Sequence, residues 1–211
     1  MLPPHRHGSP LNSPLLLPQF PFPEVWTGKI AYLDRDGVLN KWSENYVNTP
    51  QEVEVLPNSG KSVAALRRSG FRVCVVTNQS PIGRGLWGHK RLEQINQELQ
   101  DQLLEEDSEA HLDLILYSPY TPSEGSWARK PNPGMLEAAR QIIESAEKGI
   151  HEIHISYGAD WVDRPDESES VLVGDQPTDI EAASSFGVKG IQCSQTIGIS
   201  EVMSQIIQTR G

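Results

Sequence analysis

The stretch AYLDRDGVLN, residues 31–40, ends an apolar run in two carboxylates, Asp34 and Asp36, and Gly37 follows them directly. Two carboxylates about 4 Å apart repel each other by roughly 1 kcal/mol in water and by about 4 kcal/mol at an effective dielectric constant of about 20. A divalent cation offsets that repulsion, and Mg²⁺ prefers a few carboxylates together with water and phosphate oxygens. The pair therefore predicts a metal-assisted site at the end of a buried strand.

Outward from this stretch, apolar runs alternate with segments of helical period. The pattern predicts strands over residues 29–34, 71–77, 112–117, 170–175 and 188–193, and helices over residues 57–70, 89–107, 133–147, 178–187 and 201–209. Thr178 and Glu181 match a capping box at the start of the fourth helix. Strands that alternate with helices favour a parallel sheet covered on both faces. We predict an α/β fold, a Rossmann-like three-layer parallel sheet, in a single domain over residues 26–211.

Such a sheet binds its ligands at the carboxyl ends of its strands. Chemically active side chains follow the first four predicted strands: Asp34 and Asp36, Thr77 and Asn78, Arg129 and Lys130, and Asp175 and Asp179. A carboxylate can attack phosphorus, and a second carboxylate can act as general acid and then as base. A hydroxyl group can bind a phosphoryl oxygen while an ammonium group neutralises its charge. The set predicts a phosphoryl-transfer site at one edge of the sheet.

Composition narrows the classes of partner. The formal net charge of −10 argues against non-specific binding to nucleic acid, which needs a basic surface. Cys74 and Cys193 lie far apart without metal or redox spacing, which favours a reducing compartment and no disulfide framework. The apolar run near the start is too short for a signal peptide or a membrane span. We expect a cytoplasmic protein without a membrane partner.

Two segments stand apart from the regular pattern. Residues 1–25 are rich in proline and have no period, which predicts a flexible or loosely docked tail, with Phe20, Phe22 and Trp26 as anchors for its last part. Residues 149–170 form an insertion that is long for a link between a helix and a parallel strand. It can be a surface hairpin or small extra strand, a contact with another chain, or a metal site using His151 and His154. Because the preceding helix returns the chain to the amino edge of the sheet, we expect no catalytic role for it.

Four motifs carry a resemblance to a known family. The stretches DRDGVLN (34–40), TNQSPIGRG (77–85), RKPNPGM (129–135) and VGDQPTDIEAA (173–183) resemble the successive motifs of the haloacid dehalogenase superfamily. The similarity covers about residues 28–195 and is greater for the branch that contains heptose bisphosphate and histidinol-phosphate phosphatases. It implies a Mg²⁺-dependent phosphatase of the haloacid dehalogenase type with an open site and no large cap domain, because the spacers between the motifs are short.

The resemblance also implies a role for each matching residue. Asp34 would be the nucleophile, and Asp36 the general acid and base, with its backbone carbonyl as a ligand of Mg²⁺. Asp175 would be a further metal ligand, supported by Asp179. Lys130 would stabilise the phosphoryl group. The remaining expected roles are phosphoryl binding by Thr77 and Asn78, and contact with the rest of the substrate by Arg84 and Arg129.

The chain departs from this branch in two places. The loop YSPYTPSEGSWARKP, residues 117–131, has no Cys or His where the branch usually carries three cysteines and a histidine that bind structural zinc. We therefore expect no structural zinc, with Tyr120, Trp127 and the prolines shaping the loop instead. Gln176 stands where relatives often have a basic residue.

The substrate suggested by the resemblance is a small phosphorylated sugar such as D-glycero-D-manno-heptose 1,7-bisphosphate. Histidinol phosphate or another small metabolite is the alternative within the same enzyme class. From other classes, the fold could serve as an inactive binding module, or as a regulator that stays phosphorylated on Asp34. A competent residue at every catalytic position argues against the first, and Asp36 as a general base argues against the second. The sequence leaves the oligomeric state open.

Overall fold

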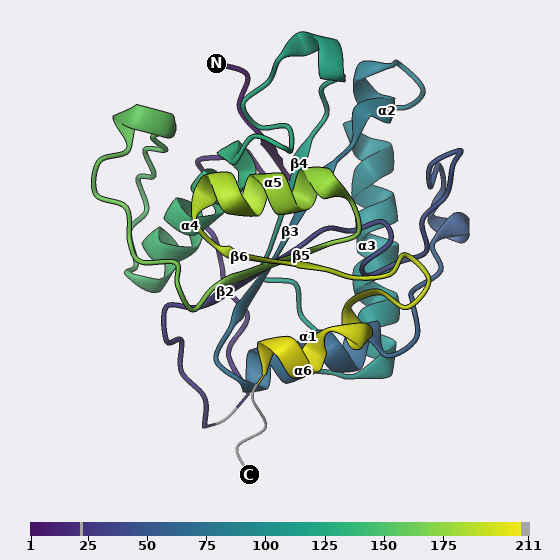
Figure 1. Cartoon of the computed structure of the whole chain (residues 1–211), viewed down its shortest axis with the longest axis horizontal. Coiled ribbons are helices and arrows are strands. Elements are labelled where there is room, and N and C mark those ends of the chain that lie inside the picture. Colours follow the sequence, from purple (N-terminus) through teal and green to yellow (C-terminus); the bar gives the residue numbers. More distant parts are fainter. Residues whose placement is uncertain (22, 208–211) are drawn as a thin grey trace.

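A single six-stranded sheet lies between two layers of helices in the computed structural model, which describes residues 1–21 and 23–207 (Figure 1). The strands follow the order β1-β4-β3-β2-β5-β6. They span His5–Arg6 (β1), Ile30–Leu33 (β2), Arg72–Asn78 (β3), Leu114–Ser118 (β4), Val171–Gly174 (β5) and Lys189–Gln192 (β6). Strands β2 to β6 are parallel, and β1 pairs antiparallel with the outer strand β4. The predicted α/β fold is confirmed, with one antiparallel edge strand that the sequence pattern did not reveal.

The central strands are apolar because both of their faces are buried. All four residues of β2 and of β5 are buried, and alternate side chains enter two separate cores. Ala31 and Leu33 enter one core, whereas Ile30 and Tyr32 enter the other. A strand covered on both faces has no polar alternation, which is why these strands read as continuous apolar runs.

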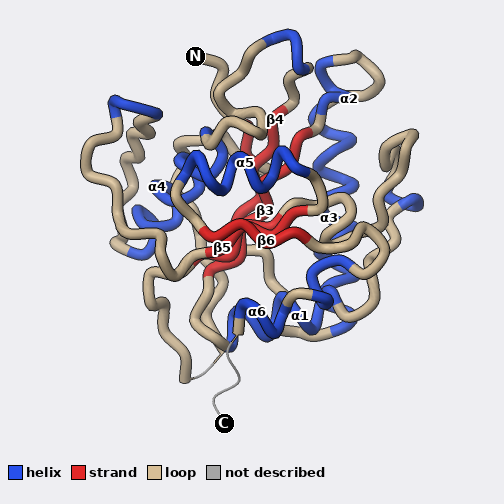
Figure 2. Tube along the Cα trace, viewed as in Figure 1, coloured by secondary structure: helices blue, strands red, loops and turns tan. Residues whose placement is uncertain are grey.

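The helices that follow the strands divide between the two faces. Helices α1 (Ser59–Arg68) and α3 (His89–Glu106) pack on one face, and α4 (Gly134–Glu147) and α5 (Pro177–Phe186) pack on the other (Figures 1 and 2). The short helices α2 (Ser80–Gly83) and α6 (Met203–Ile206) and the 3-10 turns η1 (Pro50–Glu52), η2 (Pro122–Glu124), η3 (Gly158–Asp160) and η4 (Gly198–Glu201) complete the fold. No helix of residues 1–21 and 23–207 has the length and apolar character that a membrane crossing requires.

Two predicted helix ends are corrected. Helix α5 begins at Pro177, and its capping box joins Gln176 to Asp179 rather than Thr178 to Glu181. Proline suits the first helical position because its fixed φ is already helical and its missing N–H needs no partner there. The single helix predicted over residues 201–209 is wrong. The 3-10 turn η4 ends at Glu201, and the short helix α6 spans only Met203–Ile206. Positions 208 and 209 lie outside the described residues.

The N-terminal segment makes closer contacts than a loosely docked tail. Residues His5 and Arg6 pair with Tyr117 and Leu116 of β4, beside which the purple trace runs in Figure 1. The guanidinium carbon of Arg72 lies over the Phe20 ring, 4.0 Å from the ring centroid. An edge strand presents unpaired backbone groups, and β1 satisfies them on β4. Trp26, a second predicted anchor, packs against the core on the α4 side, whereas Phe22, the third, lies outside the described residues.

The insertion at residues 149–170 contains no strand and only the 3-10 turn η3. It packs on the α4 side of the sheet, where Ile153 is buried. Near its end, Glu167 is buried and forms an ion pair with Arg140 of α4, while Ser170 Oγ accepts a hydrogen bond from Ile30 N at 3.1 Å. Buried charges are tolerated when they are paired in this way. The insertion is thus held to the core of the domain.

Docking of the N-terminal strand should weaken in acid. The His5 ring stacks on His89 with centroids 4.7 Å apart, and His89 Nδ1 lies 2.9 Å from Tyr117 Oη. Burial and, next, the neighbouring His89 lower the pKa of His5 below its ordinary value of 6.5. A lowered pKa means that the docked state favours the neutral His5 ring. Docking is therefore strongest above pH 6.5, the ordinary pKa of histidine, and is lost as the pH falls through the lowered pKa of His5.

Amide hydrogen exchange at His7, whose N–H donates to Ile115 O at 3.0 Å, provides the measurement. After correction for intrinsic rates, we expect its protection to fall between pH ~7.5 and pH ~5, the range in which histidine titrates. His5→Phe keeps a ring for stacking but cannot titrate, so its pH dependence should be smaller. Equal protection across the range in the unmodified protein would show that His5 does not control docking.

Candidate active site

The carboxyl ends of the parallel strands surround a cavity of about 220 Å³. Of the residues predicted to act in catalysis, substrate binding or metal binding, all except Arg84 line it. The lining residues are Asp34, Asp36, Trp42, Ser43, Tyr46, Val47, Thr77, Asn78, Arg129, Lys130, Asp175, Gln176, Thr178 and Asp179. Side chains that are far apart in the sequence therefore meet where the strand ends predicted them to meet.

Three carboxylates form the one group suited to hold a metal ion among residues 1–21 and 23–207. Asp34, Asp175 and Asp179 each offer an oxygen, and these oxygens lie within 4.8 Å of one another. Asp175 Oδ2 accepts hydrogen bonds from the side-chain amides of Gln176 and Gln195 at 2.5 and 2.6 Å. Asp175 Oδ1 is buried and accepts none from the described residues. A carboxylate oriented through one oxygen, with the other oxygen free, is a suitable ligand for a hard divalent cation.

Glycine makes this close approach of backbone and carboxylates possible. A Cβ on Gly37 would lie 2.8 Å from Asp175 Cγ, and Gly37 has φ +80°. A Cβ on Gly174 would lie 2.2 Å from Asp179 Cβ. Both distances are too short for a side chain. The glycines in DRDG and VGD are therefore required by the geometry of the site, and Gly37 is required also by its positive φ.

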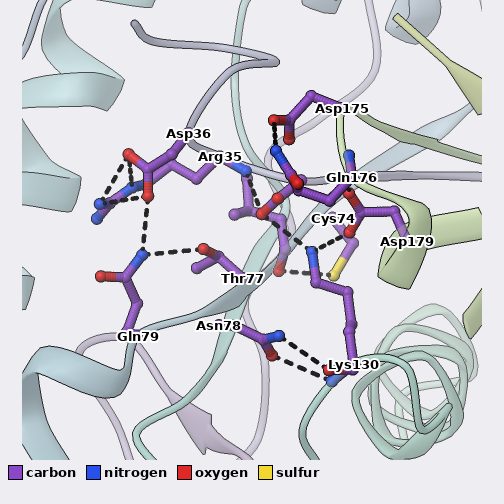
Figure 3. A network of polar contacts seen from close by, with 12 residues as sticks. Arg35, Asp36, Cys74, Thr77, Asn78, Gln79, Lys130, Asp175, Gln176 and Asp179 are labelled. Carbon is purple, nitrogen blue, oxygen red and sulfur yellow. Dashed lines mark hydrogen bonds and ion pairs between the residues drawn. The ribbon is translucent and has the colours of Figure 1, made fainter. Parts of the chain in front are cut away.

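Lys130 supplies the positive charge among these acids. Its Nζ lies 3.0 Å from Asp34 Oδ1 and 2.5 Å from Asp179 Oδ1, and its side chain is only 2% exposed. The Asn78 side chain fixes the backbone of Lys130, since Asn78 Nδ2 donates to Lys130 O at 3.0 Å and Lys130 N donates to Asn78 Oδ1 at 3.1 Å (Figure 3). The Asn78 amide thus positions Lys130, and its contact with the phosphoryl group, expected from the sequence, stays a prediction.

The electrostatics of Asp34 reflect this crowding. The pKa of Asp34 is raised to about 7, mainly because the carboxyl group is buried. The Lys130 charge lowers this pKa, but the charges of Asp179, Asp36 and Asp175 oppose that effect. A cation placed among these carboxylates would favour the ionised form of Asp34, which is the nucleophilic form. The donor set and its excess negative charge fit Mg²⁺.

The Asp36 side chain points away from the carboxylates of Asp175 and Asp179 (Figure 3). Arg35 Nη2 lies 2.9 Å from Asp36 Oδ2, and Asn40 Nδ2 donates to Asp36 Oδ1 at 2.9 Å. Gln79 Nε2 donates both to Asp36 Oδ2 at 3.0 Å and to Thr77 Oγ1 at 2.9 Å (Figure 3). Thr77 Oγ1 accepts from Gln79, so its own proton is free for a phosphoryl oxygen. This arrangement fixes the Asp36 side chain in place.

Sequence reasoning did not assign Arg35, Asn40 or Gln79, although all three lie inside the motifs DRDGVLN and TNQSPIGRG. The sequence carried no signal for them, because their burial appears only in the structure. Arg35 and Asn40 are each 1% exposed, and Gln79 is 3% exposed. Buried polar side chains need partners, and here the partner is Asp36, the predicted general acid and base.

The rim of the cavity adds residues from the loop between β2 and η1. Trp42 and Tyr46 line the cavity and remain 49% and 37% exposed. Arg129 lines it from the loop after β4, and burial followed by the Arg84 charge lowers the pKa of Arg129. The Arg84 guanidinium group is thus close enough for its charge to act on Arg129, but Arg84 does not line the cavity. Neighbouring guanidinium groups attract an anion to this side of the opening.

The loop after β4 is held by polar and aromatic contacts. Trp127 Nε1 donates to Glu137 Oε2 at 2.7 Å, and Gly158 N of the insertion donates to Glu137 Oε1 at 3.1 Å. Arg164 pairs with the same buried carboxylate. Tyr120 Oη donates to Pro3 O at 2.9 Å. The insertion thus reaches the loop that carries Lys130, although it begins at the opposite edge of the sheet.

Known proteins match this chain in sequence and in fold. A sequence model of the family described as HAD-hydrolase-like matches residues 127–197. The D-glycero-beta-D-manno-heptose-1,7-bisphosphate 7-phosphatase of Pseudomonas putida is 34% identical over 163 residues, which cover 77% of this chain and 81% of that protein. The enzyme of the same name from Pseudomonas aeruginosa is 39% identical over 154 residues, or 73% of this chain and 74% of that protein.

Two solved structures share the fold at 24% identity. One is the D,D-heptose 1,7-bisphosphate phosphatase of B. bronchiseptica complexed with magnesium and phosphate, with a TM-score of 0.64 over 84% of this chain and 99% of that one. The other is a putative HAD-like phosphatase from Mesorhizobium loti, with a TM-score of 0.62 over 94% and 95% of the two chains.

Removing the charge of Lys130 should destabilise the metal-free protein. In Lys130→Met, buried carboxylates lose their counter-charge, and we expect the free energy of unfolding to fall by about 3 kcal/mol in EDTA above neutral pH. A second change, Asp179→Asn, should recover part of the loss because it removes one of the unpaired charges. Urea denaturation measures both effects.

The control is Lys148→Met, which removes an exposed pair with Glu144 one helical turn away. Such pairs contribute only about 0.3–0.5 kcal/mol. If Lys130→Met cost no more than Lys148→Met, Lys130 would not be the group that balances the carboxylates.

Proposed function

We propose that this chain, which belongs to the haloacid dehalogenase-like hydrolases, is a Mg²⁺-dependent phosphatase that acts on a phosphorylated sugar through an aspartyl phosphate. The family and the phosphatase activity predicted from the four motifs are confirmed by the relatives named above. The observation that carries the mechanism is the position of Asp34. It follows β2 at the floor of the cavity, 3.0 Å from Lys130 Nζ and grouped with Asp175 and Asp179.

The proposed reaction has two steps. Asp34 attacks the phosphorus atom, so that a bond forms between its carboxylate oxygen and phosphorus while the bond to the sugar oxygen breaks. Asp36, as a carboxylic acid, donates its proton to the leaving oxygen. Asp36 then takes a proton from the water that attacks the aspartyl phosphate, which releases phosphate and restores Asp34.

The other groups stabilise charge during these steps. Thr77 Oγ1 donates to a phosphoryl oxygen, and the Lys130 ammonium group faces the charge that builds on the phosphoryl group. Asp34, Asp175 and the backbone carbonyl of Asp36 would hold Mg²⁺, which offsets the negative charge of both carboxylate and phosphate. Asp179 supports this set through Lys130 and the start of α5.

The proposed substrate is D-glycero-D-manno-heptose 1,7-bisphosphate, the compound in the names of the relatives. The residues of the rim suit a sugar that carries a second anionic group. The faces of Trp42 and Tyr46 suit the apolar side of a sugar ring, and Arg129 with Arg84 suits a further phosphate group. We place the enzyme in the cytoplasm as part of this proposal, because Cys74 and Cys193 are both free thiols.

The purified protein should release phosphate from this heptose bisphosphate with Mg²⁺ and not with EDTA. Asp34→Asn removes the attacking carboxylate, so we expect less than about a thousandth of the turnover, a barrier higher by about 4 kcal/mol. Asp163→Asn, an exposed acid in the insertion, is the matched control and should retain full turnover. The nucleophile assignment would fail if Asp34→Asn kept more than about a tenth of the rate, a change below about 1.4 kcal/mol. A higher kcat/KM for histidinol phosphate would redirect the substrate but leave the chemistry in place.

We also expect the protein to carry no structural zinc. Structural zinc sites use four thiolate or imidazole ligands, and the loop over residues 117–131 has none to offer. Elemental analysis of protein purified without a tag should give less than about one-tenth equivalent of zinc. Stoichiometric zinc that survives chelation would contradict this expectation.

A further inference from the structure

A second cavity lies on the α3 side of the sheet, and none of its residues lines the first. It measures about 240 Å³ and is enclosed by the N-terminal segment, α3 and the start of β4. Its polar lining includes Arg6, His7, Asn96, Gln97 and Gln100. The proposed reaction uses none of these residues.

Arg6 brings an unbalanced positive charge to this cavity. It is 9% exposed, and no carboxylate of residues 1–21 and 23–207 lies within 4.0 Å of its guanidinium nitrogens. Its Nη1 donates to Ser13 O at 2.6 Å, whereas its Nε has no acceptor in the part of the chain that the structure describes. A buried charge without a counter-ion is costly, so the site favours a negatively charged ligand.

The acid in the cavity wall does not balance Arg6. Asp113 Oδ1 lies 2.6 Å from Arg67 Nη1 and 2.7 Å from Arg72 Nη1, and Asp113 Oδ2 accepts from Val73 N at 2.7 Å. Asp113 is thus paired with both arginines, and Arg72 also pairs with Glu147 at 2.6 Å, so the charges of these four residues balance one another. Among the residues that line the cavity, the charge of Arg6 is therefore the one without a counter-charge in the described chain, and the Glu93 carboxylate acts on His7 from outside the lining.

Two further polar atoms point to the kind of ligand. Asn96 is fully buried, and its Nδ2 has no acceptor among the described residues. The Nδ1 of His7 is likewise buried without a partner there. The amide and the guanidinium Nε–H are donors, and the histidine nitrogen becomes one when it carries the ring proton. Converging donors beside a positive charge match the oxygens of a carboxylate or phosphate group.

Asn96 also connects this cavity to the catalytic site. Its Oδ1 accepts a hydrogen bond from Arg35 Nη1 at 3.2 Å. The same guanidinium group holds Asp36, through Nε at 3.2 Å from Oδ1 and Nη2 at 2.9 Å from Oδ2. A ligand that accepts from Asn96 Nδ2 would fix the amide with its carbonyl toward Arg35. It would thereby hold Arg35 against the general acid and base.

We propose that this cavity binds a small metabolite through a carboxylate or phosphate group, and that its occupancy raises turnover by ordering Asn96, Arg35 and Asp36. The site is distinct from the substrate cavity, and the binding part of the proposal does not depend on the proposed reaction. The direction of the effect follows from the geometry, because the ligand and Arg35 occupy opposite ends of one side-chain amide.

The binding experiment uses the full chain labelled with ¹⁵N-arginine. Succinate and inorganic phosphate are titrated separately at constant ionic strength, and the Arg6 Nε–Hε signal is followed by NMR. We expect a saturable shift, and the tighter of the two probes identifies carboxylate or phosphate as the recognised group. No saturable shift with either probe would mean that the cavity holds water only, and the proposal would be overturned.

Two variants keep the result specific. Arg6→Gln removes the positive charge. The Nε–Hε signal that is absent from the spectrum of this variant is thereby assigned to Arg6. Asn96→Asp is nearly isosteric and keeps an acceptor for Arg35, but it replaces the donor with a negative charge. In Asn96→Asp the Arg6 signal should no longer respond to either probe, with the fold verified by circular dichroism. An unchanged response in Asn96→Asp would place the anion elsewhere and overturn the site.

The kinetic arm measures kcat with an aryl phosphate, with and without saturating succinate. We expect at least a twofold rise in kcat for the unmodified protein and a ratio of one in Arg6→Gln and in Asn96→Asp. Saturable binding without any change in kcat would overturn the link to Asp36. Absence of all phosphatase activity would count against the proposed function and leave the NMR result to decide the binding site.

Discussion

The ammonium group of Lys130 between Asp34 and Asp179 is the interaction on which the active site depends. Four carboxylates converge at this edge of the sheet, and a buried cluster of like charges is strongly unfavourable without compensation. Lys130 contacts two of them, and the start of α5 stabilises Asp179 through the backbone N–H of Gln176. Asp36 is paired with Arg35, and the negative charge that remains on Asp34, Asp175 and Asp179 favours a bound metal ion. Loop geometry serves the same end, because Asn78 fixes the backbone from which Lys130 extends.

The order of the strands explains why these residues can meet. The chain runs outward from β2 to β3 and β4 and then returns to the other side of β2 with β5 and β6. Loops leave the sheet in opposite directions at β2, and a crevice opens there. Asp34 and Asp36 lie at the end of β2, Thr77 lies at the end of β3, and Asp175 follows β5. The site therefore occupies the place where this topology opens a binding crevice.

Two accessory segments support the loop that carries Arg129 and Lys130. The N-terminal segment accepts hydrogen bonds from Tyr120 and Ser126 through Pro3 O and Leu2 O. From the other side, Glu137 joins Trp127 to Gly158 of the insertion. In this chain a buried carboxylate and an edge strand hold a loop that contains neither Cys nor His. Each is a long-range contact, so the loop depends on the completed fold rather than on its own sequence.

The sequence by itself determined the parallel α/β core and the membership of the active site. Continuous apolar runs predicted strands because both faces of these strands are buried, and every predicted site residue except Arg84 lines the cavity. A polar residue directly after an apolar run is visible in the local sequence. Because parallel strands have their carboxyl ends at the same edge of the sheet, this local pattern also predicts where the residue lies in the fold.

Only the tertiary structure decided which side chain each polar group contacts. Asn78 of β3 holds Lys130, Gln79 joins Asp36 to Thr77, and Glu137 of α4 joins Trp127 to the insertion, so each contact links different elements or loops of the fold. The pairing of β1 with β4 is of the same kind, since a two-residue strand has no period to detect. Such contacts depend on the relative placement of segments distant in sequence. That placement is set by packing the whole sheet between its helices, and no local pattern of residues records it.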